Sequence, residues 1–151
     1  MKRIILIAAV CAAAIALASC ASLQRSWDQW NVENVATLID TGQSARLAAM
    51  STTPFLVDGE IVLMKADVAG FWNGIIKAGF KIEGPVLQSG QPLTANSYKQ
   101  FADTMEVKSF FGQYVKKGSR LLELKTSAGK SILLIVRDSY TRTIQGFKGP
   151  Y

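Results

Sequence analysis

The segment LLELKTSAGKSILLIVR, residues 121–137, predicts two β-strands joined by a tight connection. Apolar residues dominate 121–126 and 131–137, and the four residues between them include Gly129, which is typical of a hairpin loop. Two apolar runs separated by a short glycine-containing turn favour antiparallel pairing. The C-terminal third of the chain therefore predicts β-sheet, and a further short strand is expected over 141–144.

Two amphipathic helices are predicted upstream, over 68–78 and 104–117. Both place apolar residues at i, i+3, i+4, i+7 and i+8, which gathers them on one helix face. The stripes are Val68, Phe71, Trp72, Ile75 and Ile76 in the first helix, and Val107, Phe110, Phe111, Tyr114 and Val115 in the second. Asp67 is the expected N-cap of the first helix, and Gly79 follows its C-terminus. A strand is the alternative for the second segment, because part of it also alternates.

An N-terminal helix is predicted over 27–41, because Ser26 and Gln29 have the spacing of a capping box. A short helical piece is expected over 44–49. Strands are expected over 50–55, 61–64 and 80–83, the first two joined at Asp58-Gly59, and residues 88–96 are expected to form a loop. Residues 97–102 fit either a helical turn or a strand. The predicted fold is α+β: about three helices packed on one face of a curved, mostly antiparallel sheet of about five strands.

A charged and then apolar leader precedes these elements. Lys2-Arg3 is followed by an unbroken apolar run of 14 residues, 4–17. A membrane-spanning helix needs about 20 apolar residues, so the run is too short to span a bilayer and is typical of a signal peptide.

The four residues Leu17-Ala18-Ser19-Cys20 follow that run and resemble the bacterial lipobox at every position. The resemblance implies that the Cys20 thiol is alkylated with diacylglycerol and that a signal peptidase cuts between Ser19 and Cys20. An ordinary secretory signal cut nearby is the alternative. Ala21 stands where an aspartate would favour the inner membrane, so the periplasmic face of the outer membrane is the expected location.

These features predict three parts: a signal peptide over 1–19, a lipidated tether over 20–25 and one α+β domain over 26–151. The chain has a net charge of +6, and residues 105–151 hold nine basic residues against three acidic ones. This basic third is interpreted as a solvated surface, with anionic headgroups or an acidic partner as the alternative. Nucleic acid is not an expected partner, because the basic residues accompany no recognised motif.

Chemistry-bearing residues are few. The chain contains no histidine, which excludes a Ser-His-Asp triad, a Cys-His pair and a histidine metal site. Asp40, Asp58, Glu60 and Asp67 do not have the spacing of a calcium loop and are interpreted mainly as helix-end and turn residues. No catalytic residue, metal ligand or cofactor is therefore assigned.

Aromatic residues supply the one candidate ligand pocket. Trp30, Phe55, Trp72 and Phe80, together with Trp27, would line an apolar pocket if the fold brought them together. Aromatic residues at helical spacing are more often core residues, and the core is the favoured interpretation.

The stretch from Pro54-Phe55 through Asp58-Gly59-Glu60 to Phe71-Trp72 resembles nuclear-transport-factor-two-like (SnoaL-like) domains in element order. The resemblance implies N-terminal helices and a curved sheet around a conical pocket. The helix expected over 104–117 departs from that pattern.

The sequence thus favours a membrane-anchored lipoprotein with a non-catalytic accessory domain that binds a partner protein or a small apolar ligand. One alternative is a pocket enzyme of the isomerase or cyclase type that uses a carboxylate or a tyrosine. The other is a structural component of the cell envelope.

Overall fold

Six strands form one sheet in the order β2-β1-β6-β5-β4-β3, and β1 and β6 are its parallel neighbours. The computed structural model describes residues 22–137 and 142–151. The strands are β1 (Ser51–Val57), β2 (Glu60–Val62), β3 (Val86–Pro92), β4 (Ser119–Lys125), β5 (Ser131–Arg137) and β6 (Thr143–Lys148). The helices are an N-terminal helix over 22–40, α2 (Ser44–Met50), α3 (Lys65–Lys77), the 3-10 helix η1 (Ser97–Gln100) and α4 (Met105–Gln113). The expected α+β class and the mostly antiparallel sheet are confirmed.

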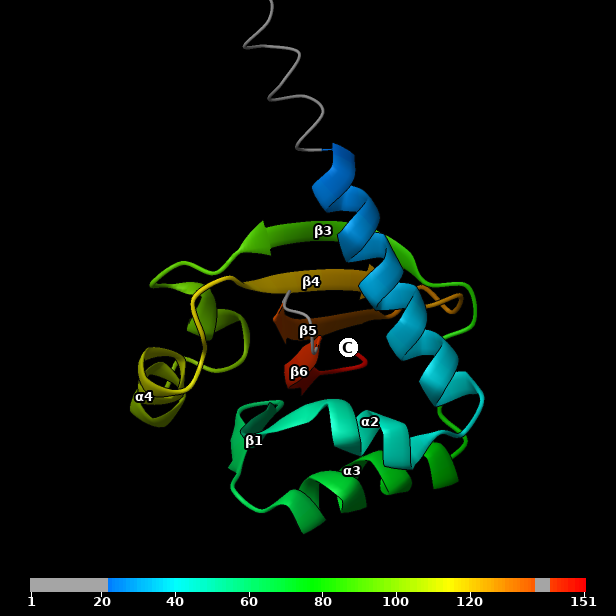
Figure 1. Ribbon diagram of the computed structural model, residues 1–151, viewed down its shortest axis with the longest axis horizontal. Coiled ribbons are helices and arrows are strands. Elements are labelled where there is room, and N and C mark those ends of the chain that lie inside the picture. Colours follow the sequence, from blue (N-terminus) through cyan, green and yellow to red (C-terminus); the bar gives the residue numbers. More distant parts are fainter. Residues whose placement is uncertain (1–21, 138–141) are drawn as a thin grey trace, which may run out of the picture.

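Helices cover both faces of the sheet, so the expectation that they all pack on one face is wrong. The N-terminal helix, α2 and α3 share a core with Leu122 and Leu124 of β4, whereas η1 and α4 share a second core with Leu121. Figure 1 shows the N-terminal helix crossing the sheet, with α4 well separated from that helix. The physical reason lies in β4 and β5, whose consecutive apolar residues point to alternate faces and need cover on both.

The predicted hairpin is confirmed. β4 and β5 pair over seven positions, from Ser119 opposite Arg137 to Lys125 opposite Ser131. β6 runs to Lys148 and is longer than the expected strand over 141–144, whose first residue lies outside the described part of the chain.

Two helix starts differ from expectation. The N-terminal helix is already helical at residue 22, and the Ser26 hydroxyl donates to the Ser22 carbonyl inside it at 3.1 Å instead of capping it. Residues 22–25 of the expected tether are therefore helical. Helix α3 has Met64 as its N-cap, and Asp67 lies in its first turn, where a carboxylate also interacts favourably with the helix dipole. Its end is as expected, because Gly79 has a φ of 74°, in the left-handed region.

The strand expected over 80–83 is a loop. Asp40, at the end of the N-terminal helix, accepts the Ile82 and Glu83 backbone N–H groups at 2.7 and 3.0 Å, which takes donors that a strand would need. The next strand along the chain is β3 (Val86–Pro92). It occupies residues 88–92, where a loop over 88–96 was expected.

The segment over 104–117 contains a helix, α4, and not a strand. The Thr104 side chain caps it by accepting the Val107 backbone N–H at 3.3 Å, and the helix ends at Gln113, four residues earlier than expected.

Candidate functional site

The structure brings three of the four residues of the predicted aromatic pocket into one core and leaves Trp30 outside it. Phe55 and Trp72 are fully buried with ring centroids 5.9 Å apart, and Phe80 packs at the margin of the same core. Trp30 lies on the surface, 41 % exposed. The structure therefore places the predicted pocket residues partly in the core and partly in solvent.

The buried part of this set fills the protein interior. The centroid of the Trp72 ring lies 4.9 Å from that of Phe71 and 5.5 Å from that of Phe147. The Trp72 indole N–H donates to the Ser51 hydroxyl at 2.9 Å. Close aromatic packing with a satisfied indole is the signature of a core residue. A small recess between the N-terminal helix and strands β5 and β6 has a volume of about 10 Å³, room for roughly one water molecule.

The buried acid of the described part of the chain is Asp28, which is 1 % exposed. Its carboxylate accepts two hydrogen bonds from Arg120, from Nε at 2.8 Å and from a terminal nitrogen at 2.7 Å, and a third from Gln24 at 3.2 Å. Arg120 also donates to the Gly90 carbonyl at 2.8 Å. This bidentate pair joins the N-terminal helix to β3 and β4, and it leaves the carboxylate engaged rather than free to accept a proton from a substrate.

The other acids considered from the sequence have separate roles. Asp40 holds the loop after α3, and Asp58 accepts the Gly149 backbone N–H at 2.8 Å. Asp67 lies in the first turn of α3, and Glu60 is exposed in β2. Within the described ranges no three acidic, histidine or cysteine side chains are grouped so as to hold a metal ion.

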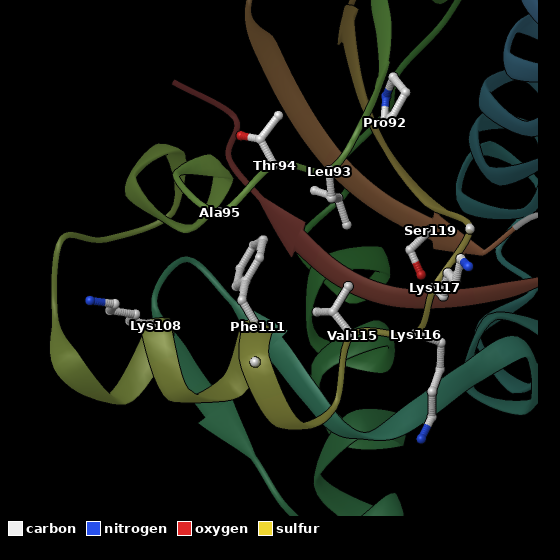
Figure 2. Close-up of a pocket in the computed structure, with 12 residues that line it drawn as sticks. Pro92, Leu93, Thr94, Ala95, Lys108, Phe111, Val115, Lys116, Lys117 and Ser119 are labelled. Carbon is white, nitrogen blue, oxygen red and sulfur yellow. The ribbon is translucent and has the colours of Figure 1, made fainter.

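A groove of about 470 Å³ lies between the end of β3 and helix α4. Leu93 enters it from the segment after β3, and Phe111 and Val115 enter it from α4 and the residues that follow (Figure 2). We call this feature the β3–α4 groove; its lining is Pro92, Leu93, Thr94, Ala95, Lys108, Phe111, Gly112, Val115, Lys116, Lys117, Gly118 and Ser119.

Lysines flank the apolar floor of the β3–α4 groove. Lys108 and Lys116 extend away from the floor in different directions, and Lys117 lies near Ser119 (Figure 2). All three are exposed, and none forms an ion pair within the described part of the chain. No carboxylate, cysteine or tyrosine lines the groove, so it offers apolar contact and positive charge but no acid–base pair.

Sequence reasoning missed this groove. Leu93 belonged to an expected loop, and Phe111 and Val115 belonged to an apolar helix stripe that predicts burial. The apolar stripe gave no signal of this, because it continues past Gln113, where α4 ends. Tyr114 and Val115 therefore fall beyond the helix and pack less deeply.

Among the residues that the structure describes, Tyr151 is the titratable group whose pKa is clearly shifted. Partial burial, and secondarily the negative charge of Glu123, raise the pKa of its phenol above the ordinary value. It lies outside the lining of the β3–α4 groove.

The lipobox residues Ser19 and Cys20 lie outside the described residues. Over 22–137 and 142–151, no helix has both the length and the apolar character needed to cross a bilayer.

Comparisons with protein-family models, curated proteins and solved structures gave no significant match.

Proposed function

We propose that the chain is a membrane-anchored envelope lipoprotein, lipidated at Cys20 after cleavage at Ser19, whose domain binds a partner protein and is not a catalyst. The proposed binding site is the β3–α4 groove, and the proposed location is the periplasmic face of the outer membrane. The observation that carries the binding role is the composition of the groove, which combines an apolar floor with unpaired lysines and has no acid–base pair.

The filled interior supports a non-catalytic domain. A pocket enzyme of the isomerase type needs an open cavity with a free carboxylate or phenol, whereas here Trp72 occupies the interior and Asp28 is engaged by Arg120. In our proposal the domain is nuclear-transport-factor-two-like in layout, with aromatic side chains filling the volume that would be a conical pocket in that family.

The shape and charge of the β3–α4 groove favour a protein segment over an enclosed small ligand. Small-molecule sites usually bury most of their ligand, whereas this groove is an open surface feature. A segment that places an apolar side chain on Leu93, Phe111 and Val115, with acidic residues beside it, would match both the floor and the lysines.

Filling the groove tests the binding role. Gly112 lines the groove, and a Cβ added there meets nothing within 4 Å, so Gly112→Leu introduces a bulky apolar side chain whose Cβ is accommodated. Gly74 in α3 has the same freedom and makes Gly74→Leu a matched control. In the intact lipoprotein within its native envelope, a photo-crosslinking residue at Thr94 should form a defined protein adduct. Gly112→Leu should abolish that adduct and Gly74→Leu should preserve it.

Charge reversal supplies a second arm. Lys116→Glu with Lys117→Glu should weaken the adduct, whereas Lys125→Glu with Lys130→Glu at the β4–β5 hairpin should leave it unchanged. An adduct that survives both groove variants would contradict the proposed site. A small bound molecule seen by native mass spectrometry, in place of a protein adduct, would favour the apolar-ligand alternative.

The anchoring part has its own experiment. Cys20→Ser should leave an unprocessed precursor of larger mass that takes up no acyl label. A variant that matures and still fractionates with membranes would contradict lipidation at Cys20.

A further inference from the structure

The first turns of the N-terminal helix carry an exposed apolar stripe that the core does not use. Leu23, Trp27 and Trp30 are 62 %, 46 % and 41 % exposed. At 100° per residue these three positions fall within about 60° of one another on the helix surface. We call them the tryptophan stripe. Large apolar side chains gathered on one exposed face mark a contact surface.

The docking of the helix fixes the direction of the stripe. Asp28 and Val32, on the other side of the helix, are 1 % and 0 % exposed, and Asp28 is bound to Arg120 of β4. The helix therefore has little freedom to rotate its tryptophans inward. Its first turns also extend past the β3 edge of the sheet (Figure 1), so the stripe projects beyond the domain.

A cation lies against the stripe. The Arg142 guanidinium is 3.7 Å from the centroid of the Trp30 ring and 5.1 Å from that of Trp27. Arg25 is exposed on the same helix, and Glu33 is the acid nearby, engaged by Gln29 at 2.8 Å. Tryptophan is the residue that concentrates at membrane–water interfaces, and arginine suits bidentate contact with phosphate.

The short distance between the tryptophan stripe and the proposed lipid anchor at Cys20 points to the membrane as the surface that the stripe contacts. Leu23 is three positions after Cys20 in the chain, so their Cα atoms lie at most about 11 Å apart. From Leu23 to Trp30 the helix rises by about 10 Å. An interfacial helix buries its apolar face about 5–10 Å into the headgroup and acyl boundary. An acyl chain on Cys20 would thus hold the stripe within reach of that boundary.

We propose that the tryptophan stripe inserts into the interface of the anchoring membrane, with Arg142 against anionic lipid phosphates, and so sets the orientation of the domain. This inference rests on the proposed lipidation of Cys20. It gives the domain a defined membrane-facing side.

The three tryptophans of the chain make this measurable. The lipidated protein, purified from its host, is reconstituted into vesicles of phosphatidylcholine brominated on its acyl chains and phosphatidylglycerol. Tryptophan emission should fall about twofold relative to unbrominated vesicles, because interfacial rings lie close to the acyl chains. The double variant Trp27→Phe/Trp30→Phe retains Trp72, which is 0 % exposed, and its emission should be unaffected by bromine.

Arg142→Gln tests the charged part. It should remove the extra quenching seen in vesicles that contain phosphatidylglycerol over vesicles of phosphatidylcholine alone. Lys130→Gln, in the hairpin at the other end of β5, should not change it.

The outcomes separate the inference from the proposed function. One outcome overturns the inference and leaves the anchoring proposal intact. In it, the wild-type protein floats with the vesicles and carries acyl mass, but bromine quenches its emission no more than that of the double variant. A stripe that serves as a contact surface for a partner protein, and not for lipid, would give that result. Purified protein without acyl mass overturns both.

Discussion

Replacing Arg120 by methionine should destabilise the protein through Asp28. The substitution keeps an unbranched side chain, but it removes both short hydrogen bonds from Arg120 and leaves a carboxylate that is 1 % exposed with Gln24 alone as donor, at 3.2 Å. Removing one partner of a buried ion pair costs about 3–5 kcal/mol, because the remaining charge stays desolvated. That is a large share of the roughly 5–15 kcal/mol of a typical domain.

Urea unfolding of the purified mature protein, followed by circular dichroism, measures this loss. The partner variant Asp28→Leu/Arg120→Met removes both charges and should recover most of the stability. Hydrogen exchange should localise the effect, because the ion pair joins the N-terminal helix to the sheet. In Arg120→Met, amides over 24–34 should exchange faster, while amides of β5 should change only in proportion to global stability.

Gly90→Ala should disturb the Asp28–Arg120 ion pair by crowding the Asp28 carboxylate. A Cβ at position 90 would overlap the Asp28 carboxylate, whereas a Cβ at Gly74 meets nothing within 4 Å. Gly90→Ala should therefore destabilise the fold and Gly74→Ala should not. A loss below about 1 kcal/mol in Arg120→Met, the level of an exposed pair, with unchanged exchange over 24–34, would refute a buried and structurally important ion pair.

Three further outcomes are expected. Thr104→Ala removes the side chain that accepts the Val107 N–H and should cost about 1 kcal/mol in urea unfolding. Trp72→Ala empties the aromatic core and leaves the Ser51 hydroxyl without its indole donor, and should cost about 3–5 kcal/mol in the same measurement. The raised pKa of Tyr151 means that this phenol ionises at lower pH in the unfolded chain than in the folded protein. Its contribution to folding stability should therefore be fully present below about pH 10 and be lost as pH rises through the folded pKa. Tyr151→Phe should flatten that alkaline decline in thermal unfolding curves.

Local patterns were sufficient for several elements. The β4–β5 hairpin, α2 and the end of α3 at Gly79 follow from periodicity and turn chemistry within about a dozen residues. Elements that depend on distant partners were misplaced. The segment over 80–83 has the alternation of a strand, but Asp40, some 40 residues earlier, binds its backbone N–H groups.

The amino-acid sequence by itself determined the α+β class, the hairpin, the amphipathic faces and the lipobox pattern at Cys20, because each is a short-range property of consecutive residues. Only the tertiary structure decided which faces meet. It divided the predicted aromatic set between a filled core at Trp72 and an exposed stripe at Trp30, and it joined Asp28 to Arg120 across 92 positions. It also opened the β3–α4 groove between segments that are separate in the chain. Periodicity indicates that a side chain has an apolar face, but packing between distant elements decides whether that face is buried.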